Sequence, residues 1–216
     1  MSVVRSLERR LERLMEGVAG KIFSGRLHPS ELAGKLAREA DLARFDHPSG
    51  PATANHYVIE VNQKDLNMDP EELSTMLAAE VFDYTIEEGL RLEGPVSVTV
   101  ETTDQVSPGS ANVHVEVKPG IISTWSRLVS TGATMDITYN RTLLGRSADM
   151  DIALDDASIS RRHALIWRKN GQTWIQDLDS SNGTKLDGKP LGQDPALLVS
   201  GSVLAFGQSK YRFVEQ

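Results

Sequence analysis

The segment SISRRHALI, residues 158–166, brings two serines, two arginines and a histidine together at the start of an apolar run. Ser160 and His163, with a nearby aspartate, are the residue types of a hydrolytic triad. Arg161 and Arg162 carry the charge of a nucleic-acid contact. The same residues also suit one wall of a phosphate pocket, because arginine and hydroxyl groups donate hydrogen bonds to phosphate oxygens. The rest of the sequence must decide between these three chemistries.

Hydrolytic or metal-dependent chemistry fits this segment poorly. A nucleophilic serine usually lies on a sharp, glycine-containing turn beside an oxyanion hole, and SISRRH contains no glycine. The four aspartates between residues 149 and 156 lack the glycine and the fixed ligand spacing of a calcium-binding loop. We therefore expect no enzyme activity, no catalytic residue, no metal and no cofactor.

The charge distribution argues against a nucleic-acid partner. Residues 1–120 hold 12 Lys/Arg and 20 Asp/Glu, whereas residues 121–216 hold 11 and 10. Because phosphate contacts supply most of the affinity for nucleic acids, an acidic first half disfavours that class of partner. The sequence has no cysteine, no apolar run of membrane-spanning length and no signal-peptide pattern. We expect a cytoplasmic protein without direct membrane insertion.

Other residues in the second half of the chain also support a phosphate pocket. Three groups of polar residues each follow an apolar, strand-like run: Gly145-Arg146, Ser160 to His163, and Asp179 to Thr184. A phosphorylated side chain carries almost two negative charges and three acceptor oxygens. Arginine can bind it with two parallel hydrogen bonds, and serine hydroxyls add further donors. The spacing predicts three loops that meet around a phosphate.

The elements that precede these loops differ between the two halves of the chain. Residues 1–118 show helical and strand-like periodicities in alternation, which predict a small α+β domain. Helices are expected over 6–23, 29–42 and 70–88, and strands over 56–62, 96–102 and 112–118. In the helix over 70–88, Asp69 is a candidate N-cap and Gly89 a candidate stop.

After Lys118-Pro119-Gly120 the helical period ends and short strand-like runs follow one another, separated by Gly, Asn, Asp and Ser. This pattern is typical of a β-sandwich and predicts a domain boundary near residues 119–121. We expect Trp125, Trp167 and Trp174 to fill the core of the sandwich.

Residues 121–216 resemble the forkhead-associated (FHA) family in the run LLGRSADMDIALDDASISRRHALI and in IQDLDSSNGT. The resemblance implies an eleven-stranded β-sandwich that binds phosphothreonine peptides through loops at one end. It assigns phosphopeptide binding to Arg146, Ser160, Arg161, Ser181 and Asn182, and structural support of the pocket to Gly145, His163 and Gly183. Two positions depart from the family pattern: Asp187 replaces a common asparagine, and Ser158 replaces an arginine of some relatives.

The first half resembles the N-terminal domain of actinobacterial FhaA-type proteins in LERRLERLMEGVAGKIFSGRLHPSELAGKLARE, YVIEVNQKDL and EVFDYTIEEG. The resemblance implies a phosphothreonine-dependent adaptor in bacterial Ser/Thr kinase signalling, linked to cell-wall synthesis or division. Its expected partners are phosphothreonine-containing proteins, such as Ser/Thr kinases or their substrates, which would recruit it to the inner face of the membrane. The alternative is a scaffold that acts through the N-terminal domain and uses the FHA domain as a phosphate-independent platform.

Thr102 and Thr103 stand in VETTDQVS, which is similar to the kinase-targeted ETT segments of small actinobacterial FHA proteins. The resemblance makes both threonines candidate phosphorylation sites. The alternative is the end of a strand that runs into a hairpin turn.

Overall fold

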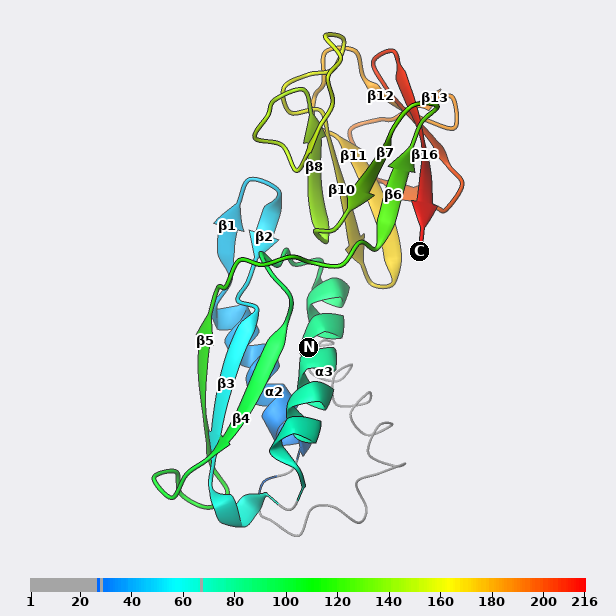
Figure 1. Cartoon of the computed structure of the whole chain (residues 1–216). Coiled ribbons are helices and arrows are strands. Elements are labelled where there is room, and N and C mark those ends of the chain that lie inside the picture. Colours follow the sequence, from blue (N-terminus) through cyan, green and yellow to red (C-terminus); the bar gives the residue numbers. More distant parts are fainter. Residues whose placement is uncertain (1–26, 28, 67) are drawn as a thin grey trace. The chain divides into compact units, whose positions relative to one another are not determined.

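A computed structural model of the chain describes residues 27, 29–66 and 68–216 (Figure 1). The chain forms two compact units. The first contains the residues up to Asp46 together with 52–85 and 92–121, and the second contains 47–51, 86–91 and 122–216. The helix expected over residues 6–23 lies outside the described residues.

Among the described residues up to 121, the elements are two α-helices, a short 3-10 helix and five strands. In chain order they are α2 (Pro29–Leu42), β1 (Phe45–His47), β2 (Gly50–Ala52), β3 (His56–Val61), η2 (Gln63–Asp65), α3 (Pro70–Glu88), β4 (Ser97–Thr102) and β5 (Ala111–Glu116). Helix α3 begins where the sequence predicts, because the Asp69 carboxylate accepts a hydrogen bond from the Glu71 amide at 3.1 Å. It ends at Gly89, whose φ of +68° is readily adopted by glycine.

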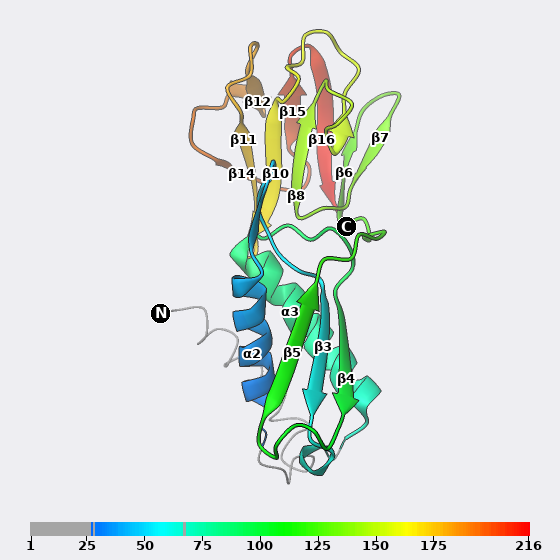
Figure 2. The ribbon, with the colours of Figure 1, turned by 90° about the vertical axis from the view of Figure 1, so that its left-hand side faces the viewer.

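Strands β4, β3 and β5 form a three-stranded sheet with β3 at its centre. Strand β3 pairs with β4 in parallel and with β5 antiparallel. Its side chains alternate, so that Tyr57, Ile59 and Val61 are buried while the residues between them are half-buried. Helices α2 and α3 lie on the same side of this sheet (Figure 2). The Ser74 hydroxyl of α3 accepts a hydrogen bond from the Val100 amide of edge strand β4 at 3.0 Å.

The remaining strands form two sheets that face each other. They are β6 (Ser126–Val129), β7 (Thr134–Ile137), β8 (Arg141–Gly145), β9 (Ile152–Ala153), β10 (Ala164–Lys169), β11 (Gln172–Asp177), β12 (Thr184–Leu186), β13 (Lys189–Pro190), β14 (Ala196–Leu198), β15 (Val203–Phe206) and β16 (Ser209–Glu215). One sheet has the order β14-β11-β10-β8-β9 and the other β13-β12-β15-β16-β6-β7. All pairs are antiparallel except β8 with β9.

The main core of this sandwich takes side chains from both sheets. Its buried members include Leu128, Leu144, Ile166, Ile175, Leu204, Phe206 and Phe213. The expectation that all three tryptophans fill this core is wrong. Trp125 packs against it, but Trp167 and Trp174 belong to a second apolar cluster with Leu143 and Leu165. Strand alternation explains this placement, because Ile166 occupies the inward face of β10 and its neighbours Leu165 and Trp167 point to the opposite face.

A buried ion pair within the second unit holds the end of the loop between β8 and β9. The guanidinium of Arg91 donates to both carboxylate oxygens of Asp151, at 2.8 and 2.9 Å, and to the carbonyl oxygen of Arg141 at 2.7 Å. Asp151 also accepts a hydrogen bond from the Leu143 amide at 2.8 Å. The side chains of Arg91 and Asp151 are only 4% and 13% exposed. The pair therefore fixes the loop after β8 against its own strand.

Among the described residues, no helix combines the length and the apolar composition that a membrane crossing requires.

Candidate functional site

Two of the three expected loops are joined through their backbones. The loop after β8 begins at Arg146, whose amide donates to the carbonyl oxygen of Ser160 at 2.9 Å. The next amide, of Ser147, donates to the carbonyl oxygen of Arg161 at 3.1 Å. The loop that follows β8 and the loop that precedes β10 therefore run side by side, and they carry Arg146 and Ser160 on adjacent backbone segments.

Gly145 makes this close approach feasible. A Cβ atom at this position would lie 2.1 Å from the carbonyl oxygen of Arg161 and 3.0 Å from that of Ser160. Any larger residue would force the two loops apart. The glycine is required by the contact between loops, which sequence inspection alone does not reveal.

The third loop, between β11 and β12, is joined to the loop before β10 through side chains. The Ser181 amide donates to the Ser160 hydroxyl at 2.9 Å, and the two serine hydroxyls lie 3.4 Å apart. The Asn182 amide group donates to the carbonyl oxygen of Ser158 at 2.7 Å. Gly183 follows with a φ of +71°, a conformation that glycine adopts without strain. The structure thus brings Ser160, Ser181 and Asn182 together.

His163 is fully buried behind these loops. Its Nδ1 atom accepts a hydrogen bond from the Ser160 amide at 3.1 Å, and its own amide donates to the carbonyl oxygen of Leu144 at 2.8 Å. Burial lowers the pKa of His163, while the Asp177 carboxylate 4.0 Å away opposes that shift. The histidine contacts the backbone of Ser160, and the serine hydroxyl instead contacts Ser181. This arrangement positions a loop and lacks the serine–histidine hydrogen bond of a hydrolytic triad.

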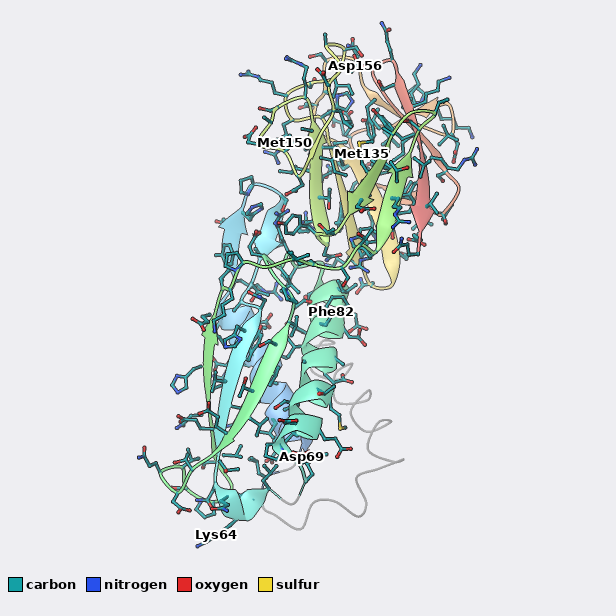
Figure 3. The ribbon with its side chains drawn as sticks, viewed as in Figure 1. Lys64, Asp69, Phe82, Met135, Met150 and Asp156 are labelled. Carbon is teal, nitrogen blue, oxygen red and sulfur yellow. The ribbon has the colours of Figure 1, made fainter. Side chains whose placement is uncertain are left out.

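Two aspartates that the sequence did not assign to the site shape its loops. Asp156 accepts hydrogen bonds from the amide and hydroxyl of Ser158 at 2.8 and 2.6 Å, and from the Ser209 hydroxyl at 2.7 Å. These hydroxyl and amide donors lower the pKa of the Asp156 carboxyl, starting with Ser158. Figure 3 shows Asp156 among the loops at one end of the sandwich. An aspartate two residues before a serine is a turn signal that could have identified it.

Asp177 has the same role in the third loop. It accepts hydrogen bonds from the amide and hydroxyl of Ser180 at 2.9 and 2.7 Å and from the Thr184 hydroxyl at 2.6 Å. Burial opposes ionisation of this carboxyl, but the donors Thr184 and Ser180 outweigh it and the pKa of Asp177 is lowered. The charged form of Asp177 therefore holds both ends of the loop that carries Ser181 and Asn182.

The three loops line one open cavity of about 730 Å³. All five expected binding residues line it: Arg146, Ser160, Arg161, Ser181 and Asn182. Arg162 adds a third guanidinium, and Asp149 is a carboxylate on the same lining. Three cations against this one anion leave the cavity positively charged, as the binding of a phosphate dianion requires.

Three other positions singled out in the sequence lie away from the cavity lining. The Asp187 carboxylate, in the turn between β12 and β13, accepts a hydrogen bond from the Val203 amide of neighbouring strand β15 at 2.7 Å. Thr102 ends β4 in the first unit. The Thr103 amide donates to the carbonyl oxygen of Val61 at 2.9 Å, so Thr103 continues the strand pairing. Phosphorylation of either threonine stays a prediction.

Two family models match the chain. The model of the FhaA N-terminal domain matches residues 4–114, just over half of the chain, and the FHA domain model matches residues 142–207. An oxoglutarate dehydrogenase inhibitor from Corynebacterium diphtheriae is 31% identical over 122 residues, which cover 56% of this chain and 78% of that protein. The FHA domain-containing protein FhaA from Mycobacterium tuberculosis is 31% identical over 130 residues, but the match covers 56% of this chain and only 25% of that longer protein.

Among solved structures, Mycobacterium tuberculosis EmbR in complex with a low-affinity phosphopeptide matches with 27% identity and a TM-score of 0.41. The match covers 43% of this chain and 25% of EmbR. The two consecutive model matches, over more than half of the chain and then over its β-sandwich, identify the family. The chain belongs to the FhaA family, in which an FhaA N-terminal domain precedes an FHA domain.

Proposed function

We propose that this protein binds phosphothreonine-containing segments of partner proteins through the cavity formed by its three loops. One observation supports this proposal above all. Arg146, Ser160 and Ser181 come from three separate loops, and backbone and hydroxyl hydrogen bonds bring them to the lining of a single cavity. In our assignment, Arg146 and the two serine hydroxyls bind the phosphate, and Arg161 and Asn182 bind the peptide next to it.

The arrangement suits binding rather than catalysis. The donors are fixed before the ligand arrives, because His163 holds the Ser160 amide and Asp177 holds the third loop. Fixed donors lower the entropic cost of binding an anion. The nearest histidine faces a backbone amide, so Ser160 lacks the general base that a nucleophilic serine needs. We infer a non-enzymatic adaptor in bacterial Ser/Thr kinase signalling.

We further propose how the chain is organised. Residues 1–118 form an α+β N-terminal domain, and residues 121–216 form an eleven-stranded sandwich that carries the binding cavity. The alternation of helices and strands up to β5 and the exclusively β elements after it support this division. For a member of the FhaA family we further propose partners that act with Ser/Thr kinases in cell-wall synthesis or division, and recruitment of this protein by them from the cytoplasm to the inner face of the membrane.

A pull-down from lysate tests the proposed function. The wild-type chain, an Arg146→Ala variant and an Arg212→Ala variant are compared before and after phosphatase treatment of the lysate. Arg212 is the matched control, because it is an exposed arginine of β16 outside the cavity lining. We expect the wild type and Arg212→Ala to capture the same proteins from untreated lysate. These proteins should be lost after phosphatase treatment, and Arg146→Ala should not capture them. Capture that is insensitive to both treatments would favour a phosphate-independent platform.

A further inference from the structure

The phosphate-binding loops account for only part of the cavity lining. Besides Ala157 and Ile159 of the loop before β10, three apolar residues, Pro48, Leu143 and Met150, line the same cavity. Leu143 is 3% exposed and belongs to the second apolar cluster, and the half-buried Met150 packs against that cluster. Figure 3 shows Met150 beside β8. The cavity therefore has a charged side, formed by the arginines and serines of the three loops, and an apolar side, which we call the apolar shelf (Pro48, Leu143 of β8 and Met150 of the loop after β8).

Pro48 comes from the turn between β1 and β2, outside the segment that matches the FHA model, but it belongs to the same compact unit as the cavity. Two arginines of that unit hold the turn. Arg162 donates to the carbonyl oxygen of Pro48 at 3.0 Å, and Arg141 donates to that of Ser49 at 2.5 Å. Arg162 also lines the cavity, so one guanidinium connects the charged side to the turn that carries Pro48.

Gly50 shows how closely this turn is fitted. Its φ is +111°, and a Cβ atom would lie 2.6 Å from the guanidinium nitrogens of Arg141. Ser49 beside it is 1% exposed. A turn whose Ser49 is buried, whose carbonyl oxygens are hydrogen-bonded and whose glycine has a positive φ presents Pro48 in one orientation. The apolar shelf is therefore formed in advance of any ligand.

We propose that the apolar shelf is a subsite that selects an apolar side chain of the bound phosphopeptide, such as leucine or methionine. This inference rests on the proposed function. The phosphate anchors contact groups that every phosphothreonine shares, so they give affinity without reading the sequence around it. Apolar contacts at a preformed surface discriminate between side chains, by about 10-fold or more for a few methylene groups.

The dimensions of the cavity limit where the selected residue stands. With equal length, width and depth, a cavity of about 730 Å³ would measure about 9 Å across, which an extended peptide crosses in roughly three residues. The selected side chain therefore lies within about three residues of the phosphothreonine. Asp149 also lines the cavity next to Met150, so an acidic residue at the selected position would meet a like charge.

A positional peptide scan tests this subsite with the whole chain. Fluorescent phosphothreonine peptides carry leucine, alanine or aspartate at each position up to three residues on either side, and anisotropy gives each Kd. For the wild type we expect one position at which leucine binds about 10-fold more tightly than alanine, with aspartate weakest. Met150→Ser and Pro48→Ser should reduce the leucine preference to less than about twofold. The Kd of the alanine peptide should stay within about twofold of its value for the wild type.

Two further variants distinguish a loss of the shelf from a general effect of losing an apolar side chain. Gly50→Val displaces the turn without changing a shelf residue and should reproduce the effect of Pro48→Ser. Leu197→Ser is the control, because Leu197 is an exposed apolar residue of β14 outside the cavity. It should keep the full leucine preference. Urea unfolding of each variant shows whether it is folded under the assay conditions.

The outcomes distinguish the subsite from the proposed function. If no peptide binds in a phosphate-dependent way, or if Arg146→Ala binds as well as wild type, the proposed function fails and the subsite fails with it. If binding depends on phosphate and on Arg146 but shows no apolar preference, only the subsite is refuted. It is equally refuted if folded Met150→Ser and Gly50→Val both retain the leucine preference.

Discussion

Replacement of Gly145 by alanine should separate the two loops that carry Arg146 and Ser160. The added Cβ would stand 2.1 Å from the carbonyl oxygen of Arg161, and real contacts of this kind do not fall below 3.0 Å. The backbones must therefore move apart by about 1 Å. The hydrogen bonds from Arg146 to Ser160 and from Ser147 to Arg161, now 2.9 and 3.1 Å long, would then exceed hydrogen-bonding distance.

The magnitude follows from these losses. Two backbone hydrogen bonds contribute about 1 kcal/mol each, and overpacking costs typically 1–3 kcal/mol, so we expect the free energy of unfolding to fall by roughly 3–5 kcal/mol. Phosphopeptide affinity should fall as well, because the phosphate ligands would no longer converge. Urea unfolding and calorimetric titration measure the two effects.

Gly192→Ala is the matched control for this substitution. No atom lies within 4 Å of a Cβ built at Gly192, and its φ is outside the region that favours glycine. The control should unfold and bind like the wild type. If Gly145→Ala also retained wild-type stability and affinity, the inference that this glycine joins the loops would be refuted.

Three further predictions concern stability and modification. Because burial lowers the pKa of His163, the unfolded chain binds more protons than the folded one, so stability should fall as pH drops below about 6.5, and a His163→Gln variant should show a weaker decline. Arg91→Ala should lower the free energy of unfolding by about 3–5 kcal/mol, because it leaves the Asp151 carboxylate buried without its partner; a loss below 1 kcal/mol in urea would contradict this. After incubation with a cognate Ser/Thr kinase, mass spectrometry should find phosphate on Thr102 or Thr103. Recovery of this peptide without phosphate would contradict that prediction.

The sequence was sufficient for the elements whose patterns are local. The helix over 70–88 carries its own cap and stop, and β3 and β10 show strand-like runs, so their positions follow from periodicity. Short elements such as β1, β2 and β13 have two or three residues and were not predicted. Such strands exist only through pairing with distant partners, and two or three residues carry too little pattern to identify them.

The binding residues of the cavity could be proposed from the sequence, but what positions them could not. Asp156 and Asp177 read as ordinary loop carboxylates until the structure shows each holding a loop. The contribution of Pro48 depends on a turn more than 90 residues before Arg146, anchored by Arg141 across 92 residues. Contacts at such separations leave no periodic or motif signal in a single sequence. The tryptophan assignment failed for a related reason, because side-chain type does not say which face of a strand points inward.

Calorimetric titration of matched phosphothreonine, phosphoserine and unmodified peptides, against the wild type and Arg146→Ala, tests the central claim most directly. The wild type should prefer phosphothreonine over phosphoserine by about 10- to 200-fold, because the extra methyl group fills a shaped site. It should not bind the unmodified peptide measurably. Arg146→Ala should lose at least about 3 kcal/mol, which makes micromolar binding undetectable, while Arg161→Ala loses less. Equal affinity for phosphothreonine and phosphoserine, or undiminished binding by Arg146→Ala, would contradict the assignment of this cavity.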